Sequence, residues 1–429
     1  MIDTIFALSS GAPPAAIAVV RISGPQSGTA LEALAGDLPT PRRACLRHLR
    51  DPAGQMLDSA LVLWLPGPGT DTGEDSTELH LHGGHAVIAA VENALADIPG
   101  LRRAEPGEFT RRAFANGRID LAQAEGLADL LSAETELQRQ SAVALAGGAF
   151  SRQVDIWREQ VLMRSAAVEA VLDFADEDDV AVLPSDFPAA LDALRAEIDL
   201  WLSRPRAEPL QQGIRVVIAG PPNAGKSTLF NTLLESDAAI TAPIPGTTRD
   251  VLTRTVAISG VPFQFFDTAG LRDETEDPIE VIGIDRARDA VASADLVLWL
   301  GAEGEGPDGA WELAAQCDRD GLPGHGAAKR APRHRVSALT GQGMAGLRLD
   351  LVDAARLLLP KPGEAALNLR QHHLLAAAAR ALNEALWTSD PLLIAEHLRL
   401  ARRAFDNLLG RATTEDMLDT LFSRFCIGK

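Results

Sequence analysis

The sequence predicts a multidomain protein with an α+β domain at the N-terminus, an all-α helical domain, and an α/β domain inserted into the helical one. Short β-type runs separated by Gly- and Pro-rich turns fill residues 1–117. Apolar residues recur at steps of three and four in 118–210 and again in 361–429, which is the pattern of helices. Between these stretches, strand and helix signals alternate over residues 213–358, as in a domain with a largely parallel sheet.

Several elements are predicted directly from these patterns. In the N-terminal domain we expect strands at Ala15–Ile22 and Ser59–Leu65 and a helix at Ala86–Ala96. Helices follow from Ile119 to about Trp201 and from about Leu369 to Phe425. The inserted domain is expected to contain, in order, a buried strand at Ile214–Ala219, a helix at Ser227–Glu235, extended chain around a turn at Val256–Asp267, a helix at Ile279–Ala292 and a strand at Ala294–Leu300.

Composition narrows the class of protein. Hydrophobic residues make up 46% and charged residues 23%, which is typical of a globular protein. A net charge of −19 argues against a broadly basic surface for nonspecific nucleic-acid binding. A local cluster of arginines remains open to two interpretations, a nucleic-acid patch or a solvated helical face: Arg102, Arg103, Arg111, Arg112 and Arg118.

The chain has no apolar run near the roughly 18 residues that a membrane span needs, and its start lacks the basic residues of a signal peptide. We therefore expect a cytoplasmic protein with no membrane span. Cys45, Cys317 and Cys426 lie far apart without metal-ligand spacing, which predicts reduced thiols and no zinc site.

Residues 220–227 read Gly-Pro-Pro-Asn-Ala-Gly-Lys-Ser, a complete phosphate-binding loop between a predicted strand and a predicted helix. Gly220 and Gly225 let backbone N–H groups surround phosphates, and Lys226 brings a positive charge to the β and γ phosphates. Ser227 is the expected Mg²⁺ ligand, and the positive end of the following helix favours the same anion. The loop predicts a GTPase-type phosphohydrolase.

Two further motifs belong to this site. Asp267-Thr268-Ala269-Gly270 follows an extended apolar run, which suits a carboxylate near Mg²⁺ and a sensor of the γ-phosphate. Thr248, within Gly246–Asp250, is the expected second hydroxyl ligand of Mg²⁺ when the γ-phosphate is present.

The negative charge that develops on the γ-phosphoryl group during hydrolysis needs a further cation to neutralise it. Two kinds of cation are possible. Arg249 and Arg272 are candidate arginine fingers by position, whereas a bound monovalent cation could instead use the Asn223 amide oxygen. Glu280 is a candidate to orient the attacking water, although it follows an acidic run, Asp273–Asp277, typical of a solvated loop.

Motifs outside the loop resemble the MnmE (also called TrmE) family of tRNA-modifying GTPases over essentially the whole chain. They are Asp3–Gly11, Val20–Gly24, Glu78–Gly84, Pro106–Thr110, Asn116–Glu125 and the tail Phe425–Lys429. The resemblance implies an N-terminal folate-binding-like domain that dimerises, a helical domain, and an inserted P-loop GTPase domain.

The activity implied by this resemblance is GTP hydrolysis coupled to tRNA modification. With an FAD-containing partner of the MnmG (GidA) family, in a heterotetramer, such an enzyme adds an aminomethyl or carboxymethylaminomethyl group to C5 of the wobble uridine, U34, of certain tRNAs. The one-carbon unit comes from a tetrahydrofolate of the 5-formyl or methylene type. GTP, Mg²⁺ and K⁺ are implied on this chain, and FAD on the partner.

The resemblance also implies residue roles. Arg21, Glu78, Arg118 and Lys429 match folate-contact positions, where basic groups suit the glutamate tail and a carboxylate suits pterin N–H donors. K⁺ ligands would come from Asn223, Ala242, Ile244 and Thr247, and Glu280 matches the water-orienting glutamate. The implied GTP-binding residues are Asn223, Ala224, Gly225, Lys226, Ser227, Thr228, Ala242, Pro243, Ile244, Pro245, Gly246, Thr247, Thr248, Asp267, Thr268, Ala269, Gly270, Asp318, Ser337, Ala338 and Leu339.

The chain departs from the family at the base-reading motif Asn-Lys-x-Asp, whose carboxylate accepts two hydrogen bonds from guanine. Ala315-Gln316-Cys317-Asp318 is the nearest remnant, so Asp318 is the expected guanine contact, and Ser337-Ala338-Leu339 resembles the other base-side loop. Two other functions stay open: a ribosome-assembly GTPase, which should carry an RNA-binding flank, and a nucleotide-gated scaffold without hydrolysis. Intact Lys226, Ser227, Asp267 and Glu280 disfavour the scaffold.

Overall fold

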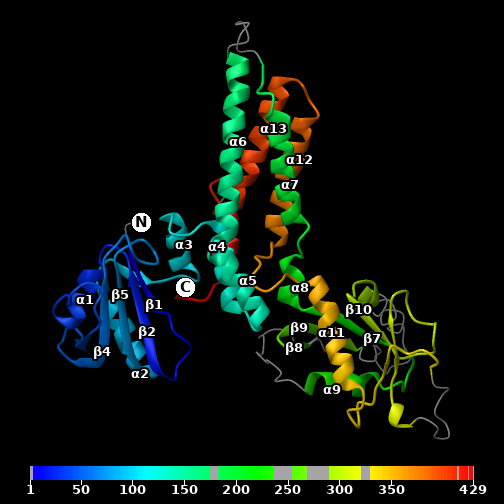
Figure 1. The fold of residues 1–429 in the computed structure, drawn as a ribbon. Coiled ribbons are helices and arrows are strands. Elements are labelled where there is room, and N and C mark those ends of the chain that lie inside the picture. The colour runs from blue at the N-terminus through cyan, green and yellow to red at the C-terminus, as the bar shows by residue number, and fades with distance from the viewer. Residues whose placement is uncertain are drawn as a thin grey trace, which may run out of the picture. The chain divides into compact units, whose positions relative to one another are not determined.

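The computed structural model describes residues 3–173, 182–235, 254–267, 289–319, 329–412, 415–423 and 425–428. Contacts between residues divide the chain into two compact units, and the elements of each are labelled in Figure 1. The first unit comprises Met1–Ala128, Ser151–Arg158 and Arg402–Lys429. The second comprises Asp129–Phe150 and Glu159–Ala401. Among the described helices, none combines the length and the apolar character that a membrane crossing requires.

A six-stranded sheet forms the centre of the first unit, in the order β3-β4-β5-β2-β1-β6. Its strands are β1 (Thr4–Leu8), β2 (Ala15–Ser23), β3 (Cys45–Arg50), β4 (Met56–Leu65), β5 (Ser76–Gly83) and β6 (Leu101–Arg103). Neighbouring strands are antiparallel except β1 and β6, which are parallel. The strands expected at Ala15–Ile22 and Ser59–Leu65 fall within β2 and β4, and the expected helix matches α2 (His85–Ala96).

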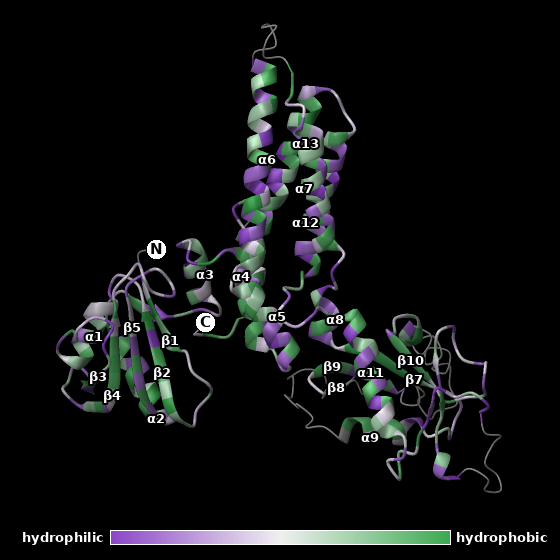
Figure 2. Cartoon of the chain, viewed as in Figure 1, coloured by the Kyte–Doolittle hydropathy of each residue, from purple (hydrophilic) through white to green (hydrophobic). Residues whose placement is uncertain are grey.

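One face of this sheet carries the hydrophobic core. Alternate residues of β2, namely Ala18, Val20 and Ile22, are buried against Leu31 of α1 (Ser27–Ala35) and Val91 of α2. Figure 2 shows the hydrophobic residues of β2 and of the helices α1 and α2 in green. The side chain of Arg21, between two of the inward positions, lies on the opposite face, as the two-residue period of a strand requires. The fold thus leaves polar side chains of the central strands available for a site.

Helices complete the first unit. They include α3 (Glu108–Ala115), α4 (Leu121–Ser132) and α14 (Glu415–Phe422). Leu121 and Ala124 of α4 form a buried cluster with Leu418 and Phe422 of α14 and with Phe425. The last helix of the chain is therefore packed beside helices that follow the N-terminal sheet.

The remaining long helices are α5 (Glu136–Ala146), α6 (Ala149–Asp173), α7 (Phe187–Leu202), α12 (Leu369–Leu386) and α13 (Pro391–Leu408). In the second unit α7 and α12 pack side by side, as Figure 1 shows. In the first unit, the rings of Trp157 and Phe405 lie 6.1 Å apart between centroids. Helices that precede the α/β region in the sequence thus pack against helices that follow it.

A second six-stranded sheet has the order β12-β11-β10-β7-β9-β8. Its strands are β7 (Ile214–Ala219), β8 (Arg254–Ile258), β9 (Val261–Asp267), β10 (Leu296–Trp299), β11 (Trp311–Ala314) and β12 (His334–Arg335). All neighbours are parallel except β8 and β9, which are antiparallel. Accompanying helices are α8 (Ala207–Gln212), α9 (Lys226–Glu235), α11 (Met344–Leu358) and a 3₁₀ turn at Cys317–Arg319. Of the helix expected at 279–292, the described part, 289–292, is helical.

Both faces of this sheet are covered, which explains the continuous apolar sequence of β7. Val216 and Ile218 are buried in a cluster with residues of α9 and α11. Val217 and Ala219 belong to a cluster on the other face, with Ala290 and Val291 packed against it. Each fully buried aliphatic side chain stabilises such a core by about 2 kcal/mol. β7 is consequently a rigid central strand, and the loop that follows it starts from a well-supported position.

Candidate active site

The loop after β7 has the backbone conformation that the glycine pattern predicts. Gly220 has φ of 150°, and a Cβ atom there would lie 3.1 Å from the backbone nitrogen of Gly301. Gly225 has φ of 93°, and Asn223 has φ of 63°, in the left-handed region. The chain therefore turns tightly between β7 and α9, with its backbone close to the end of β10.

Lys226 lies at the first position of α9 and is 7% exposed. Its ammonium donates a hydrogen bond to the carbonyl oxygen of Pro221 at 2.8 Å, across the loop. The first N–H groups of a helix have no intrahelical partner and carry partial positive charge. Strand, loop and helix thus bring the buried Lys226 ammonium and the positive N-terminus of α9 to the same place. Such a place favours the binding of phosphate groups.

Ser227 and Asp267 meet at the same end of the sheet. Their contact joins Ser227 Oγ, as donor, to Asp267 Oδ2 at 2.6 Å. The pairing of β7 with β9 places Asp267 opposite Ile218, so the carboxylate stands beside the start of the loop. A hydroxyl and a carboxylate oxygen are donors that Mg²⁺ accepts in nucleotide sites, so these residues fit that ion. Mg²⁺ bound there would supply positive charge to the phosphates.

A cavity of about 190 Å³ adjoins the loop. It brings together several residues expected to bind the nucleotide, and its lining consists of Gly225, Thr228, Leu229, Ala315, Gln316, Asp318, Arg319, Val336, Ala338 and Leu339. Ser337 instead is fully buried, and its Oγ accepts a hydrogen bond from the backbone nitrogen of Thr340 at 3.2 Å. Gln316 and Arg319 were not among the predicted nucleotide-binding residues. Their closeness in sequence to Asp318, in the segment that resembles Asn-Lys-x-Asp, could have pointed to them.

Other predicted nucleotide-site residues lie outside the described part of the chain. They are Ala242, Pro243, Ile244, Pro245, Gly246, Thr247, Thr248, Thr268, Ala269, Gly270 and Glu280, together with the alternative cations Arg249 and Arg272. Asn223 and Ala224 are described, in the turn of the loop, and the Asn223 side chain is exposed.

A second group of predicted residues meets in the N-terminal sheet. Arg21 of β2 lies directly opposite Glu78 of β5, and Arg21 Nη2 is 2.8 Å from Glu78 Oε1. The same guanidinium nitrogen is 3.2 Å from Asp71 Oδ2. Arg118 Nε donates to the carbonyl oxygen of Thr70 at 3.1 Å. The loop between β4 and β5 therefore contacts both arginines, whereas Lys429 lies outside the described residues.

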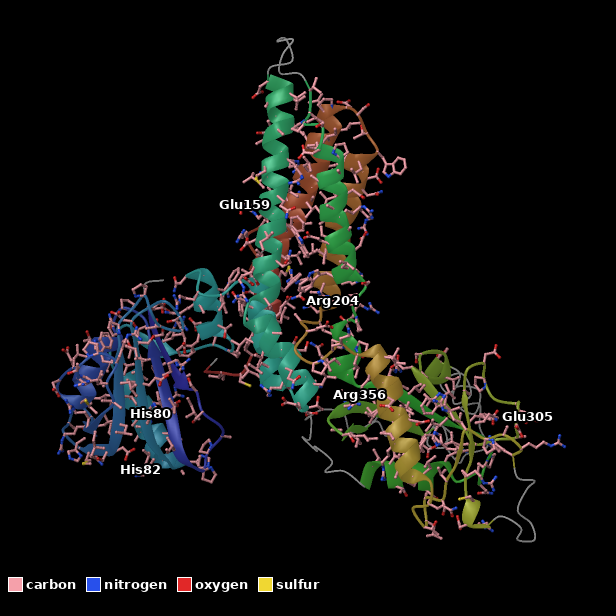
Figure 3. The ribbon with its side chains drawn as sticks, in the orientation of Figure 1. His80, His82, Glu159, Arg204, Glu305 and Arg356 are labelled. Carbon is pink, nitrogen blue, oxygen red and sulfur yellow. The ribbon has the colours of Figure 1, made fainter. Side chains whose placement is uncertain are left out.

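The Glu78 carboxylate is held in its ionised form. Burial raises its pKa, but the hydrogen bonds and positive charge of Arg21, with a hydrogen bond to His80 at 3.3 Å, outweigh this effect. The net result is a pKa below the ordinary value of 4.5. Figure 3 labels His80 and His82 on β5, where His82 Nδ1 lies 2.7 Å from Asp58 Oδ1. A stable carboxylate beside a guanidinium can offer both an acceptor and a donor to a polar ligand.

Ion pairs hold four of the five arginines in the cluster, and the buried side chain of Arg112 does not fit a wholly solvated helical face. Arg112 is fully buried, with Nη2 at 3.0 Å from both Asp3 Oδ1 and Glu108 Oε1 and Nη1 at 3.1 Å from Glu74 Oε2. The outer arginines are paired as well: Arg102 with Asp3 and Glu108, Arg103 with Glu92, and Arg111 with Asp419. Neighbouring carboxylates therefore balance these positive charges, and the nucleic-acid interpretation stays a prediction.

The C-terminal tail is packed against the N-terminal domain. Gly428 has φ of 94°, and a Cβ atom there would lie 2.1 Å from the carbonyl oxygen of Leu8. The Gly107 nitrogen donates to the Cys426 carbonyl oxygen at 3.4 Å, and the Cys426 side chain is exposed. The last described residues thus lie at the end of β1.

A largely parallel sheet with a phosphate-binding loop, a buried lysine, and a serine–aspartate pair defines a P-loop nucleotide hydrolase of the GTPase class. Comparison with known families extends this result over the whole chain. Residues 4–118 match the family model "GTP-binding protein TrmE N-terminus", and residues 121–426 match "MnmE helical domain". The chain belongs to the MnmE family.

Individual relatives agree with the family models. A "tRNA modification GTPase MnmE" from Novosphingobium aromaticivorans is 63% identical over 441 residues, covering 100% of both chains. One of the same name from Erythrobacter litoralis is 64% identical over 427 residues, again covering 100% of both. A solved structure, the cytosolic domain of the T. maritima FeoB iron transporter with GDP, is 18% identical and covers 46% of this chain and 97% of its own. The TM-score between the two structures is 0.24.

Proposed function

We propose that this GTPase modifies tRNA. Together with an FAD-dependent partner of the MnmG type, it adds an aminomethyl or carboxymethylaminomethyl group to C5 of the wobble uridine U34 of certain tRNAs. A tetrahydrofolate of the 5-formyl or methylene type supplies the one-carbon unit. The observation that carries this proposal is the full-length identity of 63% with a protein named tRNA modification GTPase MnmE. The chain acts in the cytoplasm as a homodimer, within a heterotetramer that includes the partner.

In the proposed nucleotide site, Lys226 neutralises the β and γ phosphates, and Ser227 and Thr248 hold Mg²⁺ with Asp267 close by. The hydrogen bond of 2.6 Å between Ser227 and Asp267 supports this role, because both oxygens already face one point. Glu280 orients the attacking water. Asp318 accepts hydrogen bonds from guanine, and the cavity shared by Asp318, Ala338 and the phosphate-binding loop supports that assignment.

K⁺ is the proposed additional cation at the γ-phosphoryl group, held by Asn223, Ala242, Ile244 and Thr247. The left-handed turn at Asn223 supports this proposal, because it projects an exposed amide from the loop that holds the phosphates. A positive charge at this position would stabilise the transition state as an arginine finger does.

The proposed folate site uses Arg21, Glu78, Arg118 and Lys429 of the N-terminal domain. The ionised Glu78 carboxylate, 2.8 Å from Arg21, is suited to pterin N–H donors. Arginine and lysine side chains suit the carboxylates of the glutamate tail. We assign residues 1–117 to this domain, 118–210 and 361–429 to the helical domain, and 213–358 to the GTPase domain.

Reconstitution with purified components tests the proposal. The chain, an MnmG-type partner, tRNA, GTP, Mg²⁺ and a 5-formyl- or methylene-tetrahydrofolate should convert U34 to the modified nucleoside, as measured by mass spectrometry. The reaction should be faster in K⁺ than in Na⁺. Lys226→Ala should lower GTP hydrolysis by about 100-fold or more, because a preorganised charge on the reacting phosphate is lost.

Three results would each remove a different part of the proposal. Unmodified U34 in the complete mixture would reject the tRNA reaction. Equal rates in K⁺ and Na⁺ would reject the cation site. Full hydrolysis by Lys226→Ala, with Lys361→Ala as the control at an exposed lysine, would reject the assigned catalytic loop.

A further inference from the structure

Gln316 has a backbone conformation that glutamine seldom adopts. Its φ is 56°, in the left-handed region, and it stands directly before the 3₁₀ turn Cys317–Arg319. Both ends of its amide are used: Nε2 donates to the Asn223 carbonyl oxygen at 3.2 Å, and Oε1 accepts from Arg319 Nη1 at 3.3 Å. Strain of this kind persists where the surrounding contacts require it. The side chain joins the turn to the phosphate-binding loop.

Packing ties the same two segments together. A Cβ atom on Gly225 would lie 3.0 Å from Gln316 Nε2 and 3.4 Å from Gln316 Cγ, so the Gln316 side chain packs closely against that glycine. Gly225 and Gln316 both line the 190 Å³ cavity that contains Asp318. Gln316 therefore forms the wall where the phosphate-binding loop adjoins the base-side cavity.

Backbone hydrogen bonds also hold the turn Cys317–Arg319 in place. The Cys317 nitrogen donates to the Val336 carbonyl oxygen at 3.1 Å, and the Arg319 nitrogen donates to the Gln316 carbonyl oxygen at 2.9 Å. These bonds hold the turn to the residue after β12 and to itself. The amide of Gln316 instead runs to the segment that binds phosphates, so it sets the position of the turn relative to the other end of a nucleotide.

We propose that Gln316 is a positioning residue for base recognition, which fixes the distance between the Asp318 carboxylate and the phosphate-binding loop. The inference rests on the proposed contact of Asp318 with guanine. Base and phosphates belong to one ligand, so both ends are bound well only when this distance is correct. A carboxylate that accepts from guanine N1–H and the 2-amino group discriminates against bases that lack those donors. Loosening the turn should therefore reduce the preference for guanine over other bases. The general affinity for nucleotides should fall less.

Two variants of Gln316 separate the donor from the acceptor. Gln316→Glu keeps an oxygen for Arg319 but has no donor for the Asn223 carbonyl oxygen. Gln316→Lys keeps a donor for that oxygen but has no acceptor for Arg319. Gln342→Glu, at an exposed glutamine of the neighbouring turn, is the control for the added charge. Dissociation constants for GTP, ITP and ATP are measured on the full chain by displacement of a fluorescent GTP analogue.

We expect the hydrogen-bond donor of Gln316, and not its acceptor, to determine the preference for GTP. Gln316→Glu should reduce the preference for GTP over ITP by about tenfold, with ATP binding changed much less. Gln316→Lys and Gln342→Glu should retain the preference. An unchanged preference in Gln316→Glu would overturn the proposal. Equal weakening of GTP, ITP and ATP would also overturn it, because Gln316 would then support the phosphate-binding loop alone.

A further variant separates this inference from the proposal on which it rests. The wild-type chain should prefer GTP over XTP, and Asp318→Asn should prefer XTP over GTP. The reason is that xanthine presents an oxygen where guanine has its amino group. If Asp318→Asn leaves the GTP-to-XTP ratio unchanged, the proposed guanine contact is wrong. If that ratio reverses but Gln316→Glu has no effect, the guanine contact stands and the positioning role is wrong.

Discussion

Arg112 shows how single residues set the local structure of the N-terminal domain. A buried guanidinium is tolerated when its charge is paired and its N–H groups find acceptors. Both terminal nitrogens of Arg112 have acceptors, whereas its Nε has none among the described residues. Asp3, Glu74 and Glu108 provide three carboxylates within 3.1 Å. Glu74 also accepts from the Ser23 hydroxyl at 2.8 Å, which connects the network to the end of β2. The network thereby fixes the loop that contacts Arg21 and Arg118.

The pKa of Glu108 makes this network testable by pH. Burial raises that pKa, but hydrogen bonds from Arg102, the Glu105 backbone and Arg112 lower it below the ordinary value of 4.5. A carboxyl whose pKa is lower when folded stabilises the fold above pH 4.5 and loses this contribution as the pH falls through the folded value. Glu108→Gln should therefore destabilise the domain by about 3 kcal/mol at pH 7 and flatten its loss of stability in acid.

Hydrogen-exchange protection of β1 and β6, compared at pH 7 and at a series of pH values below 4.5, measures this effect locally. Glu105→Gln is the matched control, because Glu105 is an exposed carboxylate in the same turn. If Glu108→Gln and Glu105→Gln show the same protection at pH 7 and the same change with pH, the network does not stabilise the domain.

The predicted base-side loop, Ser337–Leu339, depends on the turn before α11. Gly343 is the N-cap of that helix, with φ of 73°, and a Cβ atom there would lie 2.0 Å from the Arg335 carbonyl oxygen. Gly341, in the same turn, has φ of 79° but no heavy atom within 4 Å of such a Cβ. The two glycines share an unfavourable backbone conformation but differ in crowding.

Alanine at these two positions should separate strain from collision. Gly341→Ala should cost about 1 kcal/mol, because an L-residue is strained at positive φ. Gly343→Ala should cost about 3 kcal/mol or more, because it also forces β12 away from the start of α11. Urea unfolding followed by the signal of Trp299 or Trp311 measures both variants. Equal losses would show that the close approach to Arg335 does not constrain the turn.

The elements that are predictable from sequence are those with local signals. β7 is a run of buried β-branched residues flanked by the glycine loop, so the positions of strand, loop and α9 follow from their own residues. β6 and β12 are not predictable in this way, because Leu101–Arg103 and His334–Arg335 have almost no pattern and become strands by pairing with β1 and β11. Short strands of this kind are defined by tertiary contacts.

The same distinction applies to the candidate site. Lys226, Ser227 and Asp267 follow from motifs whose backbone geometry is local. The role of Gln316 depends on its contact with Asn223, 93 positions away in the sequence, which no local pattern reveals. The charges of Arg102 and Arg112 are visible in the sequence, but their pairing with Asp3 and Glu108 is not.

At the scale of the whole molecule, the two groups of candidate residues belong to different compact units. Arg21, Glu78 and Arg118 lie in the first unit, and the phosphate-binding loop lies in the second. The proposed nucleotide site and the proposed folate site therefore belong to different compact units of the chain. Family models for MnmE proteins match residues 4–118 and 121–426, which include residues of both units.

Nucleoside analysis of tRNA from cells lacking this chain tests whether the protein modifies the wobble uridine. We predict that the modified wobble uridine disappears in the deletion strain, returns with the wild-type chain or Lys361→Ala, and stays absent with Lys226→Ala. Wobble uridines that remain fully modified in the deletion strain would contradict the assignment of this GTPase to tRNA modification.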